Sequence, residues 1–131
     1  MSNSSVPLLS AHSITKSFGP RTARHQVLFD VSADVHAGEC LAVIGGSGSG
    51  KTTLTRVLLG LESADGGSVE YCGEPVRGDV ARKLRMQSGL VFQSPFDSLD
   101  PRWRIGRSIG EPLRMHHPDW PRERVAERVA E

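Results

Sequence analysis

The chain has 131 residues and a formal net charge of +1 at pH 7, with 37% hydrophobic and 24% charged residues. This length allows one domain with a core of its own, and the small charge gives no electrostatic footprint for nucleic acid or a polybasic membrane surface. The N-terminus lacks the positive segment and long apolar run of a secretion signal, and no apolar run reaches membrane-spanning length. We therefore expect a soluble cytosolic chain that binds no nucleic acid.

The N-terminal third of the sequence predicts antiparallel strands. Residues 1–7 are expected to be a disordered lead-in. Residues 8–15 are predicted to form a strand, although apolar and polar residues alternate only weakly there. A clearer strand is predicted over residues 27–35, where apolar and mostly polar residues alternate with a period of two. Such a pattern indicates one buried and one solvated face. The face expected to be buried consists of Val27, Phe29, Val31, Ala33 and Val35.

A glycine-rich loop follows, between a predicted strand and a predicted helix. Residues 40–44 form a short apolar run, which predicts a strand buried on both faces of a parallel sheet. After the loop, apolar residues recur on one face of a helix that is expected to end near Gly60. The loop itself fits the pattern G-x-x-x-x-G-K-[ST]. Its residues are Gly45, Gly46, Ser47, Gly48, Ser49, Gly50, Lys51, Thr52 and Thr53.

Each part of this loop suits the binding of a triphosphate. Glycines let the main chain curl so that several backbone N–H groups point at phosphate oxygens, and the start of a helix adds more N–H donors and a positive dipole end. Lys51 would place its charge against the outer phosphates, and the hydroxyl of Thr52 suits a Mg²⁺ ligand. A Gly/Ser-rich linker that happens to hold a lysine is the alternative, but it leaves the flanking strand and helix unexplained.

The remaining sequence predicts short elements. We expect a turn at residues 65–67, a strand over 68–71, a helix over 79–86 and a buried strand over 89–93 that ends at Gln93. Two further helices are expected, one around residues 105–113 and one after Pro121. The last helical pattern continues to Glu131 with no capping glycine or turn. We therefore expect the sequence to be a fragment.

Taken together, these motifs resemble the ATP-binding subunit of ABC transporters over essentially the whole chain. The glycine loop looks like the family's Walker A motif, Gln93 is similar to the Q-loop glutamine, and Phe18 is similar to the A-loop aromatic that stacks on adenine. By pattern alone, Phe18 fits a core or turn aromatic as well, and Gln93 an ordinary strand-end residue. The sequence from Gln93 to Arg114 is similar to the corresponding segment of the dipeptide, oligopeptide and nickel importers, with Asp100 where asparagine is common.

The resemblance implies an α/β fold of the P-loop NTPase (ABC ATPase) type, incomplete in this chain. It would consist of an antiparallel β subdomain, part of the parallel core sheet and the start of the helical subdomain. The expected divisions are 1–7 (lead-in), 8–95 (nucleotide-binding core with the β subdomain) and 96–131 (start of the helical subdomain). The resemblance also implies ATP and Mg²⁺ as ligands, with Lys51 and Gln93 as catalytic residues and Thr52 and Gln93 at the metal.

At full length, the resemblance implies an importer subunit that hydrolyses ATP to drive uptake of peptides, nickel or a related solute. It would act with a second ATP-binding subunit and transmembrane permease subunits at the cytoplasmic face of the inner membrane. The sequence contains no signature motif like L-S-G-G-Q, no Walker B strand ending in Asp-Glu and no switch histidine, so we expect negligible hydrolysis by these residues. The alternatives are a non-catalytic ATP-binding or interaction module and another P-loop NTPase, such as a small-molecule kinase.

Overall fold

The structure, a computed structural model, describes residues 6–131 and divides into two compact units. The first unit ends at Ser88 and the second begins at Gly89. Residues 1–5 of the predicted lead-in lie outside the described residues. The division predicted from the sequence, between residues 95 and 96, differs from this boundary and stays a prediction.

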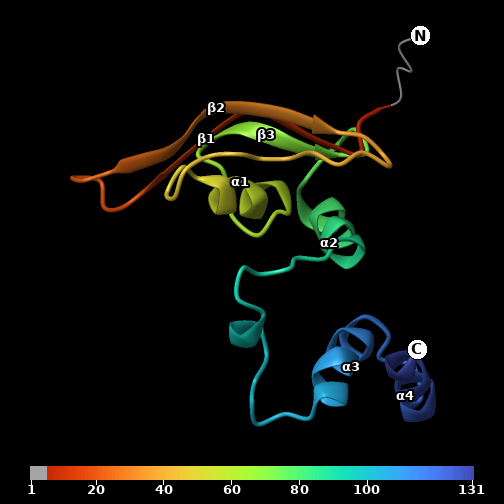
Figure 1. Cartoon of the computed structure of the whole chain (residues 1–131). Helices are drawn as coiled ribbons and strands as arrows, with labels where there is room; N and C mark the ends of the chain where they lie inside the picture. Colours follow the sequence, from red (N-terminus) through yellow and green to blue (C-terminus); the bar gives the residue numbers. More distant parts are fainter. Residues whose placement is uncertain (1–5) are drawn as a thin grey trace. The chain divides into compact units, whose positions relative to one another are not determined.

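The first unit contains a four-stranded antiparallel sheet (Figure 1). Its strands are β1 (Leu9–Phe18), β2 (His25–Val35), β3 (Gly66–Tyr71) and β4 (Glu74–Pro75). They lie in the order β2-β1-β3-β4, and each neighbouring pair is antiparallel. The sheet confirms the predicted antiparallel β subdomain.

A bulge in β1 explains why this strand alternates so weakly in sequence. Ser13 has a φ of 49°, and the pairing shifts by one residue here against both β2 and β3. An extra residue in one strand moves everything after it to the opposite face. Ala11 and Ile14, three positions apart, are therefore both buried on the same face, with 1% and 0% exposure.

A second bulge, in β2, corrects the predicted inward face of that strand. Asp30 has a φ of 53°, and the pairing shifts where β2 passes from Val31 to Leu28. Leu28 is consequently turned inward with 3% exposure, whereas Phe29 is 66% exposed. The prediction that Phe29 belongs to the buried face was wrong because a strict period of two does not continue through a bulge.

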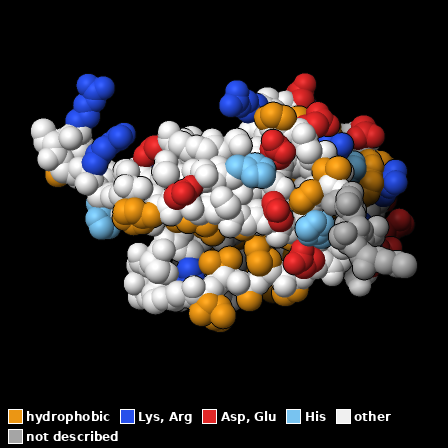
Figure 2. Space-filling model, turned by 90° about the horizontal axis from the view of Figure 1, so that it is seen from above, with side chains coloured by type: hydrophobic (Ala, Val, Ile, Leu, Met, Phe, Trp, Pro, Cys, Tyr) orange, Lys and Arg blue, Asp and Glu red, His pale blue; other side chains and the backbone are white. Residues whose placement is uncertain are grey.

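Two helices cover one face of this sheet (Figure 1), α1 (Lys51–Leu58) and α2 (Gly78–Gln87). Both helices confirm predicted ones, and Gly60, with a φ of 65°, follows α1 as expected. The outer face of the sheet carries scattered acidic and histidine side chains (Figure 2). The apolar core lies between α1 and the sheet and consists of Ala11, Ile14, Leu28, Leu54 and Val57.

Two predicted buried strands are not formed in the structure. Residues 40–46 and 89–92 are described without strand assignment, and Ile44 and Val91 are 94% and 92% exposed. A strand of a parallel sheet needs neighbours that accept and donate its backbone hydrogen bonds. Among the described residues, the paired strands are only the four of the antiparallel sheet, so these two apolar runs have no such neighbours.

The second unit is helical. It contains a 3₁₀ turn, η1 (Pro95–Ser98), followed by α3 (Ile105–His116) and α4 (Arg122–Ala130). The two α-helices confirm the predicted ones, and the buried Gly110 and Val125 lie where they approach each other. His117 stacks on Trp120 in the connection between them, with 4.2 Å between the ring centroids. Over residues 6–131, none of the helices has the length and apolar character needed to cross a bilayer.

Candidate phosphate-binding site

The glycine loop enters α1 directly and takes backbone conformations that favour glycine. Gly48 has a φ of 76°, and Gly50, which precedes the first helical residue, has a φ of 90°. Residues other than glycine rarely adopt such angles. The loop is closed at its tip by a backbone hydrogen bond of 3.3 Å from the N–H of Ser49 to the carbonyl of Gly46.

Close packing also constrains two of the glycines, Gly50 more strictly than Gly45. A Cβ atom on Gly50 would lie 2.9 Å from Cδ2 of Leu28 and 3.0 Å from the carbonyl oxygen of Val27. The start of α1 therefore rests directly on β2. A Cβ on Gly45 would lie 2.5 Å from Oγ of Ser49, within the loop itself.

The other two glycines of the loop face open space. A Cβ atom built on Gly46 or Gly48 would meet no heavy atom of residues 6–131 within 4 Å. The first turn of α1 contains no acidic residue, and no side chain in the described part of the chain caps it. Its unpaired N–H groups and positive dipole end are therefore offered to a ligand rather than to a side chain. The loop fits an anion with several oxygens.

Lys51, the first residue of α1, folds back over the loop. Its Nζ donates hydrogen bonds to the carbonyl oxygens of Gly45 and Gly46, at 2.7 and 2.6 Å, and approaches Oγ of Ser49 at 3.3 Å. These partners are all neutral, and no carboxylate of residues 6–131 forms an ion pair with Lys51. The loop thus holds a full positive charge with no neutralising partner. Thr52, next in the helix, is exposed.

A second lysine near the site has the opposite environment, and our sequence analysis missed it. Lys16, in β1, is 6% exposed. Its Nζ forms an ion pair of 2.8 Å with Glu62 and one of 3.8 Å with Asp65, and it donates a hydrogen bond of 2.5 Å to the carbonyl of Ser63. We call Lys16, Glu62, Ser63 and Asp65 the lysine clasp.

Backbone hydrogen bonds reinforce this clasp. The N–H of Asp65 donates to the carbonyl of Thr15, and the N–H of Ser17 donates to Oδ2 of Asp65, both at 2.8 Å. Residues 62–65 follow α1, so the clasp fixes the segment that leaves this helix. The packing of Gly50 against Val27 and Leu28 of β2 fixes the segment that enters α1. Both ends of α1 are therefore attached to the sheet.

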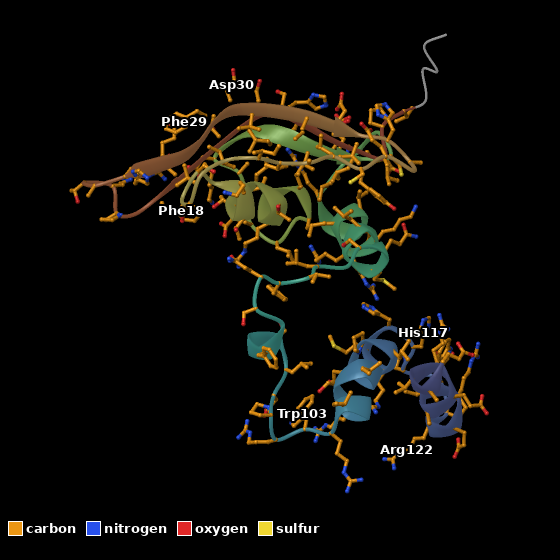
Figure 3. All side chains as sticks on the ribbon, in the orientation of Figure 1. Phe18, Phe29, Asp30, Trp103, His117 and Arg122 are labelled. Atoms are coloured by element: carbon orange, nitrogen blue, oxygen red, sulfur yellow. The ribbon has the colours of Figure 1, made fainter. Side chains whose placement is uncertain are left out.

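Phe18, the last residue of β1, lies on the same side of the sheet as α1 (Figure 3). Its ring is 43% exposed, and Nζ of Lys16 lies over the ring, 5.2 Å from its centroid. Phe29 and Asp30 project from the other side of the sheet (Figure 3). Phe18 and the glycine loop thus belong to the same unit and the same side of its sheet.

Gln93, the other predicted site residue, belongs to the second unit. It is exposed and lies just before η1, in a segment without helix or strand. Its predicted roles at the metal and in catalysis stay predictions.

The clasp makes stability depend on pH in a defined direction. A hydrogen bond from Lys16, together with the positive charges of Lys16 and Arg56, holds the pKa of Glu62 below its ordinary value of 4.5. Since the folded-state pKa is the lower one, the ion pair contributes fully above pH 4.5, and its contribution is lost as the pH falls through the folded-state pKa. We expect Glu62→Gln to lower the free energy of unfolding at neutral pH. At a pH well below 4.5, the same substitution should lower the free energy of unfolding by a smaller amount.

Urea unfolding of the wild type and the variant at the two pH values measures this difference. Glu74→Gln, at an exposed glutamate of the same unit, is the control for the loss of one surface carboxylate. A deficit of the Glu62 variant that is equal at both pH values would contradict the ionic role of this carboxylate.

Comparisons with known proteins identify the family of the chain. The family model described as "ABC transporter" matches residues 28–131. A dimeric ATP-binding cassette solved in a post-hydrolysis state with ADP and Pi has a TM-score of 0.80 at 23% identity, covering 93% of this chain and 54% of its own. A bacterial Atm1-family ABC exporter with ATP bound has a TM-score of 0.65 at 28% identity, covering 80% of this chain and 18% of its own. The first of these likenesses shows the fold alone.

Curated relatives include importer subunits. The nickel import ATP-binding protein NikE of Rhodospirillum rubrum is 40% identical over 116 residues, which are 82% of this chain and 42% of that protein. The oligopeptide transport ATP-binding protein OppF of Escherichia coli is 42% identical over 102 residues, 76% of this chain and 30% of that protein. The chain therefore spans less than half the length of these two relatives. By its matching residues and its fold, the chain belongs to the ABC transporter family.

Proposed function

We propose that this chain carries the nucleotide-binding part of an importer's ATP-binding subunit and binds Mg-ATP at the loop of residues 45–53. The observation that carries this proposal is the loop itself. Its glycines leave the backbone open to a ligand, it ends on the uncapped start of α1, and Lys51 supplies a charge that no carboxylate of the described residues neutralises.

The neighbouring residues have complementary roles. The partly exposed ring of Phe18, on the same side of the sheet, would stack on the adenine. The hydroxyl of Thr52 would ligate Mg²⁺, which accepts oxygen ligands and keeps several waters. Lys51 would exchange its bonds to the Gly45 and Gly46 carbonyls for bonds to phosphate oxygens, which are stronger because they join opposite charges.

The names of the relatives support the role of the whole protein. NikE is named for nickel import and OppF for oligopeptide transport, and one structural neighbour is dimeric. We propose that the full-length protein hydrolyses ATP at the cytoplasmic face of the inner membrane. It would pair there with a second ATP-binding subunit and with transmembrane permease subunits, and would drive uptake of peptides, nickel or a related solute.

A non-catalytic ATP-binding module is the second candidate for the 131 residues themselves. The sequence contains no L-S-G-G-Q-like signature motif and no apolar strand ending in Asp-Glu. Phosphoryl transfer depends on positioned charges around the transferred group, and the residues of the loop supply only part of them. These residues alone are therefore proposed to bind ATP and to hydrolyse it negligibly.

A calorimetric titration with ATP, with and without Mg²⁺, tests the proposal through Thr52. We expect Thr52→Val to weaken ATP binding about 10-fold in the presence of Mg²⁺, because a contact to a charged group is worth roughly 1.5–3 kcal/mol. In EDTA, the variant should bind ATP like the wild type, because the hydroxyl then has no metal to ligate.

Thr55→Val is the matched control. Thr55 lies one turn further along α1, where its hydroxyl donates a hydrogen bond of 3.0 Å to the carbonyl of Lys51. This variant should not show the Mg²⁺-specific loss. A wild-type chain that does not bind ATP would overturn the proposed function, and a Thr52 variant that is equally weakened in EDTA would overturn the metal role of the hydroxyl.

A further inference from the structure

The lysine clasp contacts the ring of Phe18, which the proposed function places against adenine. Lys16 and Phe18 are two positions apart in β1 and so lie on the same face of the strand. The bulge at Ser13 determines which face this is. It places Lys16 and Phe18 on the side of Ile14, which is the side of the sheet that packs against α1.

Lys16 is not available to bind phosphate directly. Its side chain is 8% exposed, and its ammonium is surrounded by the carboxylates of Glu62 and Asp65. Two carboxylates outweigh one ammonium, so the clasp carries a net negative charge and would not attract an anion. Lys51, in contrast, contacts neutral groups. Lys16 and Lys51 are therefore expected to have different functions.

The contacts of Lys16 make its ammonium a fixed group. Its Nζ lies 2.8 Å from the carboxylate of Glu62, 3.8 Å from that of Asp65 and 2.5 Å from the carbonyl of Ser63. The same Nζ lies over the ring of Phe18, 5.2 Å from the ring centroid. A cation at this distance is attracted to the face of an aromatic ring. Because these contacts hold the cation, it restricts the orientation of a ring that is 43% exposed at a strand end.

We propose that Lys16 is a positioning residue for the nucleotide base: the clasp holds its ammonium against one face of Phe18, so that the other face is presented to adenine. This inference rests on the proposed function, in which Phe18 stacks on the base. Stacking then benefits from a ring that has already lost its rotational freedom. The same clasp connects the base-binding end of β1 with the segment that leaves α1, the helix of the phosphate loop.

Two ligands separate positioning of the ring from support of the loop. Mg-ATP uses both the base and the phosphates, whereas magnesium tripolyphosphate uses only the phosphate loop. Calorimetry of the full 131-residue chain should show that Phe18→Ala weakens Mg-ATP at least about 5-fold, the effect of one lost base–aromatic stack. Lys16→Met should weaken it about 3-fold or more, the effect of a lost cation–π contact and ring order. Neither variant should change the affinity for tripolyphosphate.

A double variant tests whether the two residues act through each other. If Lys16 acts only by holding the ring, Lys16→Met has nothing further to remove once Phe18→Ala has removed the ring, so the double variant should bind Mg-ATP like Phe18→Ala alone. Lys83→Met, at an exposed lysine of α2, is the control and should change neither ligand.

Each of the other possible results contradicts a specific part of the proposal. Lys16→Met with unchanged ATP affinity, a loss of affinity for both ligands, or effects that add in the double variant would each overturn the positioning role. Loss of both ligands would show that Lys16 supports the fold of the loop instead. Unchanged ATP binding by Phe18→Ala would overturn the base contact and this inference with it, while leaving the phosphate site intact. A wild-type chain that binds neither ligand would overturn the proposed function itself.

Discussion

Replacing Lys51 with alanine is expected to weaken Mg-ATP binding by about 10-fold to 100-fold. The ammonium lies over the loop within 2.7 Å of the Gly45 carbonyl and 2.6 Å of the Gly46 carbonyl, where a phosphate oxygen would find the charge. A charge-assisted hydrogen bond contributes roughly 1.5–3 kcal/mol, and about 1.4 kcal/mol is a tenfold change in affinity. Since the lysine contacts only neutral partners, none of this gain is spent on breaking an ion pair.

Calorimetric titration of the wild type and the variant measures the loss, and Lys83→Ala is the control. Lys83 is an exposed lysine of α2 in the same unit, so its removal changes the net charge equally without touching the loop. Its affinity for Mg-ATP should stay within about 2-fold of the wild type, since exposed charges at a distance are largely screened. Equal affinities of the wild type and Lys51→Ala would contradict the assignment of the phosphate site.

Lys51→Ala should also lose affinity for tripolyphosphate, unlike Lys16→Met. Both variants are expected to weaken Mg-ATP binding, but only Lys51→Ala is expected to weaken tripolyphosphate binding. This is the pattern expected if Lys51 contacts the phosphates and Lys16 affects the base through Phe18. This contrast follows from their partners, because a lysine bonded to neutral carbonyls keeps an uncompensated charge and a lysine between two carboxylates does not.

The sequence was sufficient to predict the parts of the fold that depend on local chemistry. The helix α1, the glycine that follows it and the glycine loop that precedes it are determined by residues within one short segment. The four α-helices and the strands β1, β2 and β3 were predicted for the same reason, since periodicity and turn residues are local signals, whereas the two-residue strand β4 was not predicted.

The predictions that failed depend on distant partners. The apolar runs at residues 40–44 and 89–93 have the composition of buried strands, but a strand forms only where another strand pairs with it. Composition describes the side chains and gives no information about that neighbour. In the structure, Ile44 and Val91 are exposed for this reason, at 94% and 92%.

The bulges were missed because they interrupt a pattern without leaving a residue signature. Neither Ser13 nor Asp30 is a glycine, yet both have a positive φ. The role proposed for Lys16 depends on the first bulge, since the bulge determines the face of β1 on which Lys16 and Phe18 lie. One signal was present in the sequence: an ionisable residue two positions from a predicted base-stacking aromatic belongs to the same strand face.

Gly67 lies directly against the β1 bulge, and Gly67→Ala is expected to destabilise the chain by more than about 3 kcal/mol. Gly67 lies in β3 with a φ of 84°. A Cβ atom there would lie 2.5 Å from the carbonyl oxygen of Ser13 and also overlap with that of His12. Backbone oxygens of a paired strand cannot move aside as a side chain can, so the clash adds to the strain of a left-handed alanine, which is roughly 1–2 kcal/mol.

Gly38→Ala separates these two costs. Gly38 has nearly the same φ, 78°, but a Cβ atom there would meet no heavy atom within 4 Å. We therefore expect Gly38→Ala to cost only the backbone strain, roughly 1–2 kcal/mol, and Gly67→Ala to cost clearly more, as measured by urea unfolding. Equal losses would contradict the clash at the bulge. Because the bulge turns Lys16 and Phe18 toward α1, a Gly67 variant that folds should also lose part of its preference for Mg-ATP over tripolyphosphate, whereas the Gly38 variant should keep it.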